Sequence, residues 1–230
     1  MVRHETREEQ MKDVVVLIPT LGRPHHIEPL LESLYATAPD AHPLFLTTES
    51  DVAARSAIAM AGERYVDVIK KDKGDYARKI NLGYRISKEP LIFMGATDIK
   101  FHPGWLENAA QHIGGGVEVV GTNDLGNPRV IRGQHSTHTL VTRHYVKRYG
   151  TVDEPNKVLH EGYPHEYVDD EFIQTAKCRD AFAMALDSIV EHLHPTWGKG
   201  TWDNSYREVN NRLDQGYRHF CRRSKLWTQL

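Results

Sequence analysis

The chain has 230 residues, of which 40% are hydrophobic and 26% are charged, and its formal net charge at pH 7 is −2. That length suits one domain that can bury a substantial core. The small net charge excludes a global field that would attract nucleic acid or an anionic membrane, so an anionic partner would have to be bound locally.

Two features of the sequence bear on cellular location. Residues 1–13 mix charges of both signs and contain no apolar core, which argues against a secretory signal. No stretch approaches the roughly 20 apolar residues of a membrane span. Cys178 and Cys221 form neither a disulfide framework nor a CxxC metal motif, which suits a reducing compartment. We therefore expect a cytoplasmic protein that is not bound to a membrane.

Short apolar runs alternate with helical patterns over the first hundred residues. The predicted strands cover residues 14–18, 44–46, 65–69 and 91–94. Helical patterns follow the first three strands, and Ser50 or Asp51 can cap the second helix. Strands that alternate with helices of about 10 to 15 residues predict an α/β fold with a mostly parallel central sheet flanked by helices. This half has the organisation of a nucleotide-binding unit.

The pattern is less regular after residue 100. Helices are predicted at 103–112, 166–178 and 204–223, and strands at 117–121, 129–132, 137–141 and 187–193. No internal repeat, low-complexity tract or linker divides the chain. The sequence therefore predicts a single domain over residues 1–230, with a nucleotide-binding half at about 14–100 and a second half, which ends in a helix, at about 101–230.

Asp98 is the first candidate for a functional residue. It follows the apolar run 90–94 and a turn of small residues, which places it at the carboxyl end of a predicted buried strand. Open α/β sheets bind their ligands at this end of the strands. An aspartate is also a common turn former and helix cap, so its position indicates function only in the company of other polar residues.

Three adjacent carboxylates form the second candidate. Asp169, Asp170 and Glu171 precede the apolar Phe172. Such a cluster is costly unless it faces solvent, a cation or a proton-transfer reaction. The alternative is the solvated first turn of a helix, where the helix dipole stabilises acidic side chains.

A late pair of histidines is the third candidate. His192 and His194 are two residues apart at the end of a predicted strand, so both side chains point to the same face. Imidazole is a good ligand for a divalent metal. Alternatively, one histidine packs in the core and the other lies on the surface. A flexible, cationic segment that contains Lys199 follows the pair.

Two basic segments could bind an anion. Residues 73–81 could meet a phosphate at the start of a helix, although neither the Rossmann glycine fingerprint nor a P-loop motif is present. The tail at 218–225 could bind a diphosphate or a polyanionic acceptor. The alternative for each segment is the solvated face of a helix, which is the more common role of a stretch like the tail.

Taken in chain order, these features resemble those of family 2 glycosyltransferases with the GT-A fold, and the resemblance covers residues 14–227. The matching segments are IPTLGRP at 18–24, TTESD at 47–51, KGDYARKINLGYRIS at 73–87, LIFMGATDIKFHPGWL at 91–106, YVDDEF at 167–172 and EHLHPTWGKG at 191–200. The resemblance implies the GT-A fold, with donor binding in the first half and acceptor and metal binding in the second.

The resemblance also implies a nucleotide-diphosphate sugar, with UDP as the expected nucleotide, as the donor. Glu49 would lie near the uracil or the ribose. The implied donor-binding residues are Pro19, Thr20, Arg23, Glu49, Asp75, Lys79, Thr97 and Lys199.

A divalent cation, Mn²⁺ or Mg²⁺, is implied by the same resemblance, with Asp98, His194 and His192 as its ligands. Asp98 would correspond to the metal-binding carboxylate of a DxD-type motif. The sequence departs from the family at Ala96 and Thr97, where further aspartates are common, so metal binding should depend more on His194 and on the diphosphate. A cation that bridges the phosphates stabilises the charge of the leaving group.

The resemblance further implies that Asp169 is the general base, with Asp170 as the alternative. The base removes the proton of an acceptor hydroxyl as that oxygen attacks the sugar. A single in-line displacement inverts the anomeric configuration, so an α-linked donor would give a β-glycoside.

The expected function is therefore a metal-dependent, inverting glycosyl transfer, of the hexosyltransferase type, to an acceptor hydroxyl. The acceptor could belong to a glycan, a small molecule or a hydroxylated DNA base. A second hypothesis is a catalytically silent module of the same fold that binds nucleotide sugars or glycans. A third is a histidine-rich metal hydrolase.

Overall fold

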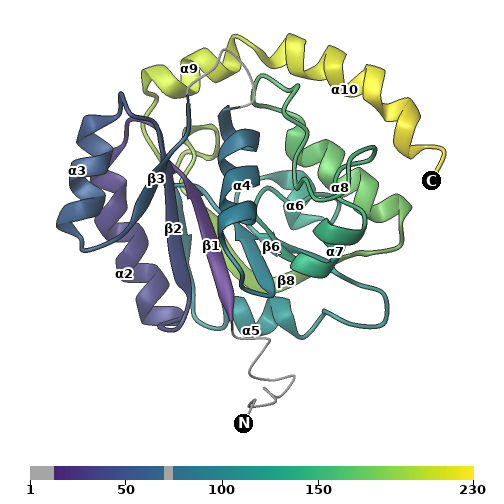
Figure 1. The fold of residues 1–230 in the computed structure, drawn as a ribbon, viewed down its shortest axis with the longest axis horizontal. Coiled ribbons are helices and arrows are strands. Elements are labelled where there is room, and N and C mark those ends of the chain that lie inside the picture. The colour runs from purple at the N-terminus through teal and green to yellow at the C-terminus, as the bar shows by residue number, and fades with distance from the viewer. Residues whose placement is uncertain (1–12, 70–74) are drawn as a thin grey trace.

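The computed structural model describes residues 13–69 and 75–230, which build one eight-stranded sheet with helices on both faces (Figure 1). The strand order is β3-β2-β1-β4-β7-β6-β8-β5. The strands are β1 (Val14–Pro19), β2 (His42–Thr47), β3 (Tyr65–Asp67), β4 (Leu91–Met94), β5 (Ile99–Phe101), β6 (Val119–Asn123), β7 (Thr139–Thr142) and β8 (Phe182–His192). The helices are α2 (Ile27–Thr37), α3 (Val52–Met60), α4 (Asp75–Ile86), α5 (Trp105–Ala110), α6 (Pro128–Ile131), α7 (Arg143–Arg148), α8 (Val168–Cys178), α9 (Asn204–Asn210) and α10 (Leu213–Trp227), with the 3₁₀ helices η1 (Pro24–His26) and η2 (Pro195–Trp197).

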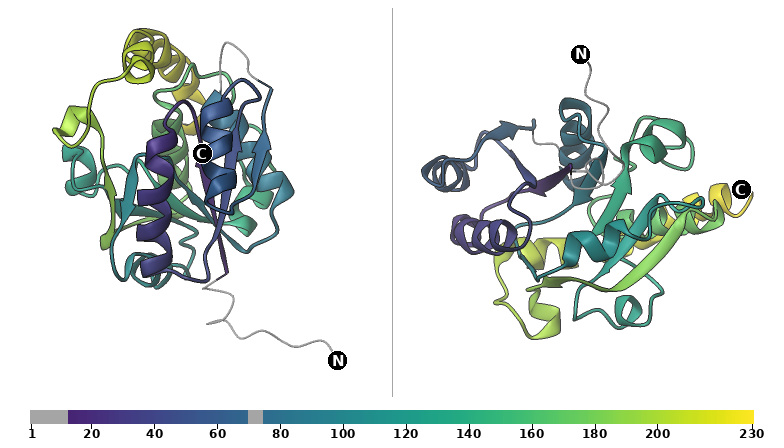
Figure 2. Two further views of the ribbon diagram at one scale, coloured as in Figure 1. Left: turned by 90° about the vertical axis from the view of Figure 1, so that its left-hand side faces the viewer. Right: turned by 90° about the horizontal axis from the view of Figure 1, so that it is seen from below.

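The strands β1 to β4 form a parallel half-sheet, as the sequence predicts. β1 pairs with β2 and β4, and β2 pairs with β3. The apolar side chains of β1 are buried on both faces, because α2 packs on one side of this half-sheet and α4 on the other (Figure 2). Asp51 accepts a hydrogen bond from the amide of Ala54 (3.3 Å), which confirms the predicted cap of α3.

The other half of the sheet is mixed. β7 runs antiparallel to β4 and to β6, β8 runs parallel to β6, and β5 runs antiparallel to β8. β6 and β8 therefore have the same direction as β1 and β4. The carboxyl ends of all the parallel strands lie at one edge of the sheet, and this edge carries the loops in which the candidate residues were predicted.

Two strand predictions differ from the structure. Residues 129–132, expected as a strand, fall in the helix α6 and the turn after it. The side chain of Asn127 caps α6 by accepting from the amide of Arg129, and Pro128 suits the first helical position. The last strand, expected from residue 187, begins at Phe182, because its first residues pair with β6 before its end pairs with β5.

The single closing helix expected at 204–223 is divided into α9 and α10 by a turn at residues 211–212. Asparagine at position 211 favours turns over helix interiors because its side chain competes for backbone hydrogen bonds. In the described part of the chain, α10 and the shorter helices all lack the combination of length and apolar character that crossing a membrane requires.

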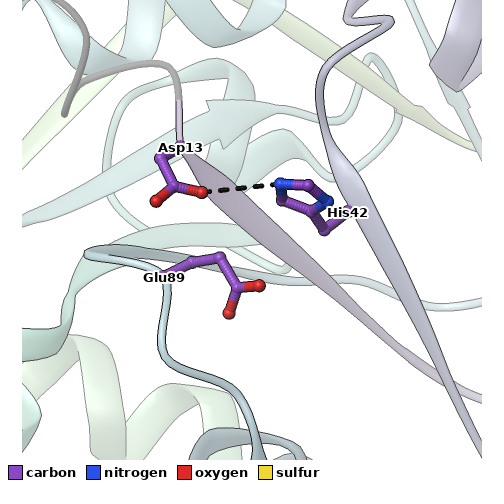
Figure 3. A group of neighbouring side chains, drawn as sticks. All are labelled: Asp13, His42 and Glu89. Carbon is purple, nitrogen blue, oxygen red and sulfur yellow. Dashed lines mark ion pairs between the residues drawn. The ribbon is translucent and has the colours of Figure 1, made fainter.

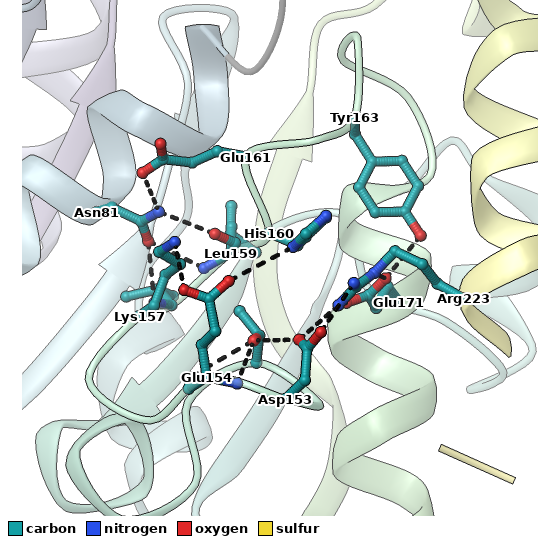
Figure 4. Close-up of polar contacts among 12 residues, drawn as sticks. Asn81, Asp153, Glu154, Lys157, Leu159, His160, Glu161, Tyr163, Glu171 and Arg223 are labelled. Atoms are coloured by element: carbon teal, nitrogen blue, oxygen red, sulfur yellow. Dashed lines mark hydrogen bonds and ion pairs between the residues drawn. The ribbon is translucent and has the colours of Figure 1, made fainter. Parts of the chain in front are cut away.

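A partly buried ion-pair group ties α10 to α8 (Figure 4). Arg223 of α10 donates to both carboxylate oxygens of Glu171 (2.7 and 2.8 Å) and to Asp153 (2.7 and 3.0 Å). Glu171, whose side chain is 3% exposed, also accepts a hydrogen bond from Tyr163 (2.7 Å). Since a buried carboxylate is stable only with such partners, this group holds the last helix against the body of the protein.

Asn81 attaches the loop before α8 to α4 (Figure 4). Its side-chain oxygen accepts from the amides of Val158 (2.9 Å) and Leu159 (3.0 Å). Its side-chain nitrogen donates to the carbonyl of Leu159 (2.8 Å) and to Glu161 (2.9 Å). A fully buried amide with four such partners is satisfied, so the loop has a defined position.

Candidate functional site

Asp98 and His192 meet at the carboxyl edge of the sheet, where β5 pairs with β8. Ile99 of β5 is the register partner of His192, and the amide of Leu193 donates to the backbone carbonyl of Asp98 (2.8 Å). Oδ2 of Asp98 lies 3.5 Å from Nε2 of His192. Sheet pairing thus brings together two predicted site residues that are far apart in the sequence.

Asp98 is a buried, ionised carboxylate. It is 4% exposed, and its Oδ2 accepts hydrogen bonds from the hydroxyl of Tyr206 (2.5 Å) and from Nη1 of Arg23 (3.2 Å). Burial alone would raise the pKa of Asp98, but His192, Tyr206 and Arg23 hold the pKa well below its usual value. The site therefore contains a fixed negative charge at neutral pH.

Arg23 connects the loop after β1 to the segment that begins α9. Its Nε donates to Asp203 (2.7 Å), and its guanidinium lies over the ring of Tyr206, 3.6 Å from the centroid. Although burial opposes the charged form, the carboxylates of Asp203 and Asp98 raise the pKa of Arg23. Asp203 and Tyr206 are absent from the sequence prediction, since no motif or spacing marks the segment that carries them.

Two further imidazoles flank His192. Its ring centroid lies 5.0 Å from that of His194 and 4.8 Å from that of His138, which directly precedes β7. Burial, and then the nearby charge of His192, lower the pKa of both His194 and His138 to about 4. Both rings are therefore neutral at physiological pH, which is the form of imidazole that binds a metal.

Several ring nitrogens at this edge make no hydrogen bond. Within the described residues, Nδ1 of His192 and both ring nitrogens of His138 are buried without a partner. Nδ1 of His194 accepts from the amide of Thr196 (3.1 Å). Buried polar atoms without partners are uncommon and call for an explanation such as a ligand or an ion.

The acidic turn at the start of α8 forms the second part of the site. Oδ2 of Asp169 lies 3.2 Å from Nε2 of His135, whereas Oδ1 of Asp170 accepts from Nη2 of Arg129 (2.6 Å). The side chain of Asp169 is 30% exposed and that of Asp170 is 12% exposed. Asp169 is therefore the more accessible carboxylate of the predicted pair.

The two neighbouring carboxylates have opposite pKa shifts. Burial favours the neutral form of both, but the hydrogen bond and charge of His135 lower the pKa of Asp169. Burial and the charge of Asp169 raise the pKa of Asp170. Two acids whose environments separate their pKa values in this way are typical of sites that move protons. Sequence analysis missed Arg129, in the short helix α6, and His135, in the irregular segment after it, because no motif marks either residue.

Electrostatic effects show that the two parts of the site share one region. After burial, the charges of Asp169 and Asp98 both raise the pKa of Tyr76 on α4. The pKa of Glu166 is raised by burial and by Asp169, and it is lowered in part by His192. Tyr76 therefore lies within electrostatic range of both Asp98 and Asp169, and Glu166 lies within range of both Asp169 and His192.

A cavity of about 410 Å³ opens at the carboxyl ends of β2 and β3. Glu49, the residue expected near the nucleoside, is part of its lining. The full lining is Thr48, Glu49, Ser50, Asp67, Val68 and Ile69. The phosphate-binding segment expected from residue 73 lies partly outside the described residues.

Several predicted donor-binding residues make contacts within the protein. Nζ of Lys79 donates to the carbonyl of Thr20 and to Asp75 (both 2.8 Å), and Lys79 is fully buried. Lys199 donates to Glu191 (2.7 Å). Pro19 ends β1, and Thr97 is buried directly before Asp98. Donor binding by these residues stays a prediction.

Three groups in the described ranges bring a histidine and two carboxylates close enough to share an ion, with donor atoms within 4.8 Å of one another. His135, Asp169 and Asp170 form the group at the candidate site, where Arg129 already supplies a positive charge. The other two are Asp153–Glu154–His160, drawn in Figure 4, and Asp13–His42–Glu89 at the opposite edge of the sheet, drawn in Figure 3.

The predicted metal set of Asp98, His192 and His194 is not one of these groups. Asp98 and His192 are in contact, but Oδ2 of Asp98 is engaged by Arg23 and Tyr206, and the ring of His194 packs against Tyr206 with centroids 4.5 Å apart. The donor atoms themselves, one carboxylate and two imidazoles, are suited to a divalent transition metal. The unpartnered Nδ1 of His192 is consistent with such a role. The metal assignment itself stays a prediction.

Comparison with known proteins connects the chain to solved structures. No protein-family model and no curated protein matches the sequence. A mannosyltransferase from Pyrobaculum calidifontis, solved in complex with GDP-Man and Mn²⁺, is similar with a TM-score of 0.61 and 15% identity over 81% of this chain. This chain spans 58% of that enzyme, which is less than two thirds of its length.

Glucosyl-3-phosphoglycerate synthase from Mycobacterium tuberculosis is similar in several complexes. The complex with phosphoglyceric acid has a TM-score of 0.57 and 15% identity, and the match covers 83% of this chain and 77% of that one. The complex with Mn²⁺, UDP and glucosyl-3-phosphoglycerate has a TM-score of 0.56 and 15% identity, with coverage of 84% and 77%. At this level of identity the similarity establishes the fold, and it confirms the GT-A architecture that the sequence predicts.

Proposed function

We propose that this chain, a protein of the GT-A fold, transfers a sugar from a nucleotide-diphosphate donor to an acceptor hydroxyl in the cytoplasm. The observation that carries the proposal is the buried, ionised Asp98 at the carboxyl end of β4, in contact with His192 and Arg23. This is the edge where open α/β sheets bind ligands. The similar enzymes were solved with UDP and with GDP-Man, so both nucleotides belong in the test.

The donor would lie across the carboxyl edge of the first half-sheet. We place the nucleoside in the cavity beside Glu49 and the diphosphate near Arg23. UDP is the first expectation, because the resemblance of the sequence to family 2 glycosyltransferases implies it. Lys79 and Asp75 would contribute to donor binding by holding the loop that contains Thr20, because Lys79 donates a hydrogen bond to the carbonyl of Thr20.

Asp98, His192 and His194 would hold the divalent cation, Mn²⁺ or Mg²⁺, and the lowered pKa of His194 keeps that imidazole neutral and able to bind a metal. When bound, the cation would supply positive charge that stabilises the diphosphate leaving group. The residues present fit such an ion in chemistry and burial, while Arg23 and Tyr206 now contact the same carboxylate oxygen of Asp98. An ion bound at Oδ2 would therefore have to share that oxygen with these two side chains or displace them.

Asp169 is the proposed general base. It is the more exposed acid of the pair, and its lowered pKa keeps it ionised and able to accept a proton. As the acceptor oxygen forms its bond to the sugar C1, its proton passes to Asp169 and the bond from C1 to the diphosphate breaks. A single displacement of this kind inverts the anomeric configuration. The acceptor would be a glycan, a small molecule or a hydroxylated DNA base.

The direct test is the release of UDP or GDP from a panel of nucleotide sugars, with and without Mn²⁺. The proposal expects slow hydrolysis of one donor that requires Mn²⁺ and is abolished by Asp98→Ala. Release that continues unchanged in Asp98→Ala would contradict it. NMR of a product made from an α-linked donor would then determine whether the configuration is inverted.

A catalytically silent binding module is the second candidate. The engagement of Asp98 by Arg23 and Tyr206 favours it, since an internal ion pair at this carboxylate satisfies the charge without a metal. This function predicts binding of a nucleotide sugar, seen as a raised melting temperature, without release of nucleotide at any Mn²⁺ concentration.

A further inference from the structure

We propose that His135 is a positioning residue for Asp169 and sets the acid limit of the transfer reaction. The inference rests on the proposed function, because Asp169 is the proposed base. It concerns a histidine that the sequence gives no reason to select.

The geometry around His135 carries the inference. Its ring is buried, with 2% of the side chain exposed, and its Nε2 lies 3.2 Å from Oδ2 of Asp169. Nδ1 lies 3.9 Å from Oδ1 of Asp170, which is beyond hydrogen-bond distance, and it has no partner among the described residues. The imidazole therefore makes one directed hydrogen bond, and that bond is to Asp169.

The segment that carries His135 is held in place on both sides. The amide of Gly133 donates to the carbonyl of Val130 (2.8 Å), and Gly133 adopts φ of 70°, which turns the chain out of α6. After the histidine, the hydroxyl of Ser136 donates to the carbonyl of His138 (2.8 Å). The ring is thus fixed by the backbone, and Asp169 is oriented by the ring.

The charged groups around His135 come from two elements, α8 and α6. Asp169 and Asp170 face it from α8, and Arg129 faces it from α6. Burial and Arg129 favour the neutral ring, but the hydrogen bond and charge of Asp169, with the charge of Asp170, raise the pKa of His135 above its ordinary value. Glu166 and Tyr76 lie close enough to Asp169 for its negative charge to raise the pKa of both groups.

The two protonation states of His135 have different consequences for Asp169. Neutral His135 donates from Nε2 to one carboxylate oxygen and leaves the other free to take the acceptor proton. Imidazolium stabilises the carboxylate anion more strongly, which weakens Asp169 as a base. Transfer should therefore decline as pH falls through the raised pKa of His135, while the proton taken from the acceptor still goes to Asp169.

The test is the pH profile of kcat for wild type and His135→Gln, in which the amide nitrogen can replace the donor at Nε2 without titrating. We expect wild-type kcat to fall about tenfold per pH unit below the pKa of His135. His135→Gln should remain active at pH 8 and lose this acid limb, and His135→Leu should lower kcat without changing the donor KM. His144→Gln, an exposed histidine at the start of α7, is the control and should keep the wild-type profile. An unchanged acid limb in His135→Gln would overturn the inference.

A second measurement separates this inference from the proposed function. Imidazole NMR, with the His135 signal identified by its loss in His135→Gln, reports the pKa of the ring without any substrate. We expect Asp169→Asn to lower that pKa. A pKa that does not move would overturn the inference even if the protein transfers sugar. If Asp169→Asn lowers the pKa of His135 but the protein transfers no sugar to any acceptor, the interaction between His135 and Asp169 is supported and the proposed function is contradicted.

Discussion

The carboxylate of Asp98 lies 3.5 Å from Nε2 of His192, and the reason is the pairing of two short strand segments. β5 begins directly after Asp98, and its first residue is the register partner of His192 at the end of β8. A shift of one residue in this pairing would turn His192 to the other face of the sheet. The local geometry of the candidate site therefore depends on the same contacts that build the second half of the sheet.

Removal of the Arg23 charge should strengthen metal binding. Nη1 of Arg23 lies 3.2 Å from the carboxylate that would hold the cation, so the two positive charges repel each other. We expect Arg23→Gln to bind Mn²⁺ alone about three- to tenfold more tightly, by isothermal titration calorimetry. Arg64→Gln, an exposed arginine, is the matched control. Weaker Mn²⁺ binding in Arg23→Gln would show that Arg23 organises the site instead of competing with the ion.

Asp169 and Asp170 should differ in their effect on catalysis. Asp169→Asn removes the proposed base, so kcat should fall by about 10²- to 10⁴-fold while the donor still binds. Asp170→Asn removes a carboxylate already paired with Arg129, and it should lower kcat much less. The comparison is made by measuring the single-turnover rate of transfer, and donor binding by calorimetry, for Asp169→Asn and Asp170→Asn. Full transfer by Asp169→Asn would show that the base is another residue.

The parts of the site that follow regular strands could be predicted from the sequence. Asp98 and His192 each stand at the end of an apolar run, and the parallel order of the sheet brings such ends to one edge. Tyr206, Asp203 and His135 could not be predicted, because each lies in or beside an irregular segment. Their roles arise from tertiary contacts alone, which no local pattern records.

Local competition explains the elements that sequence patterns misplace. Residues 129–132 have the apolar character of a strand, but the cap at Asn127 and the proline after it decide for a helix. β8 is longer than its pattern indicates, since two different neighbours pair with its two ends. The type of an element, helix or strand, was therefore predictable where one sequence signal dominated. Its first and last residues depended on the neighbouring strands that pair with it.

Arg223 should be important for stability (Figure 4). Arg223→Met would leave Glu171, whose side chain is 3% exposed, as a buried charge without its main partner. Breaking such a pair costs about 3–5 kcal/mol, which corresponds to a melting temperature roughly 6 to 20 °C lower for a chain of this size. Arg222→Met, at the neighbouring exposed position, should change little. Equal melting temperatures for the two variants would contradict a structural role for the pair.

The same group predicts an acid-sensitive contribution to stability. The hydrogen bonds and charge of Arg223 lower the pKa of Asp153 to about 2, against its ordinary 3.8. A depressed folded-state pKa means that the stabilisation is complete above the unfolded value and is lost as pH falls from about 4 toward 2. Because Asp153 is 40% exposed, the effect should be small. Urea unfolding should show wild type more stable than Asp153→Asn at pH 6, with the difference narrowing below pH 4; a constant difference would contradict the assignment.

The most direct test of the central claim is calorimetric binding of UDP and of GDP, with and without Mn²⁺, to wild type and to Asp98→Asn. Asp40→Asn, an exposed aspartate far from the β4 edge, is the control. The account predicts that Mn²⁺ strengthens binding of one nucleotide to wild type and to the control, and that Asp98→Asn loses this enhancement. Mn²⁺-dependent nucleotide binding that survives intact in Asp98→Asn would contradict it.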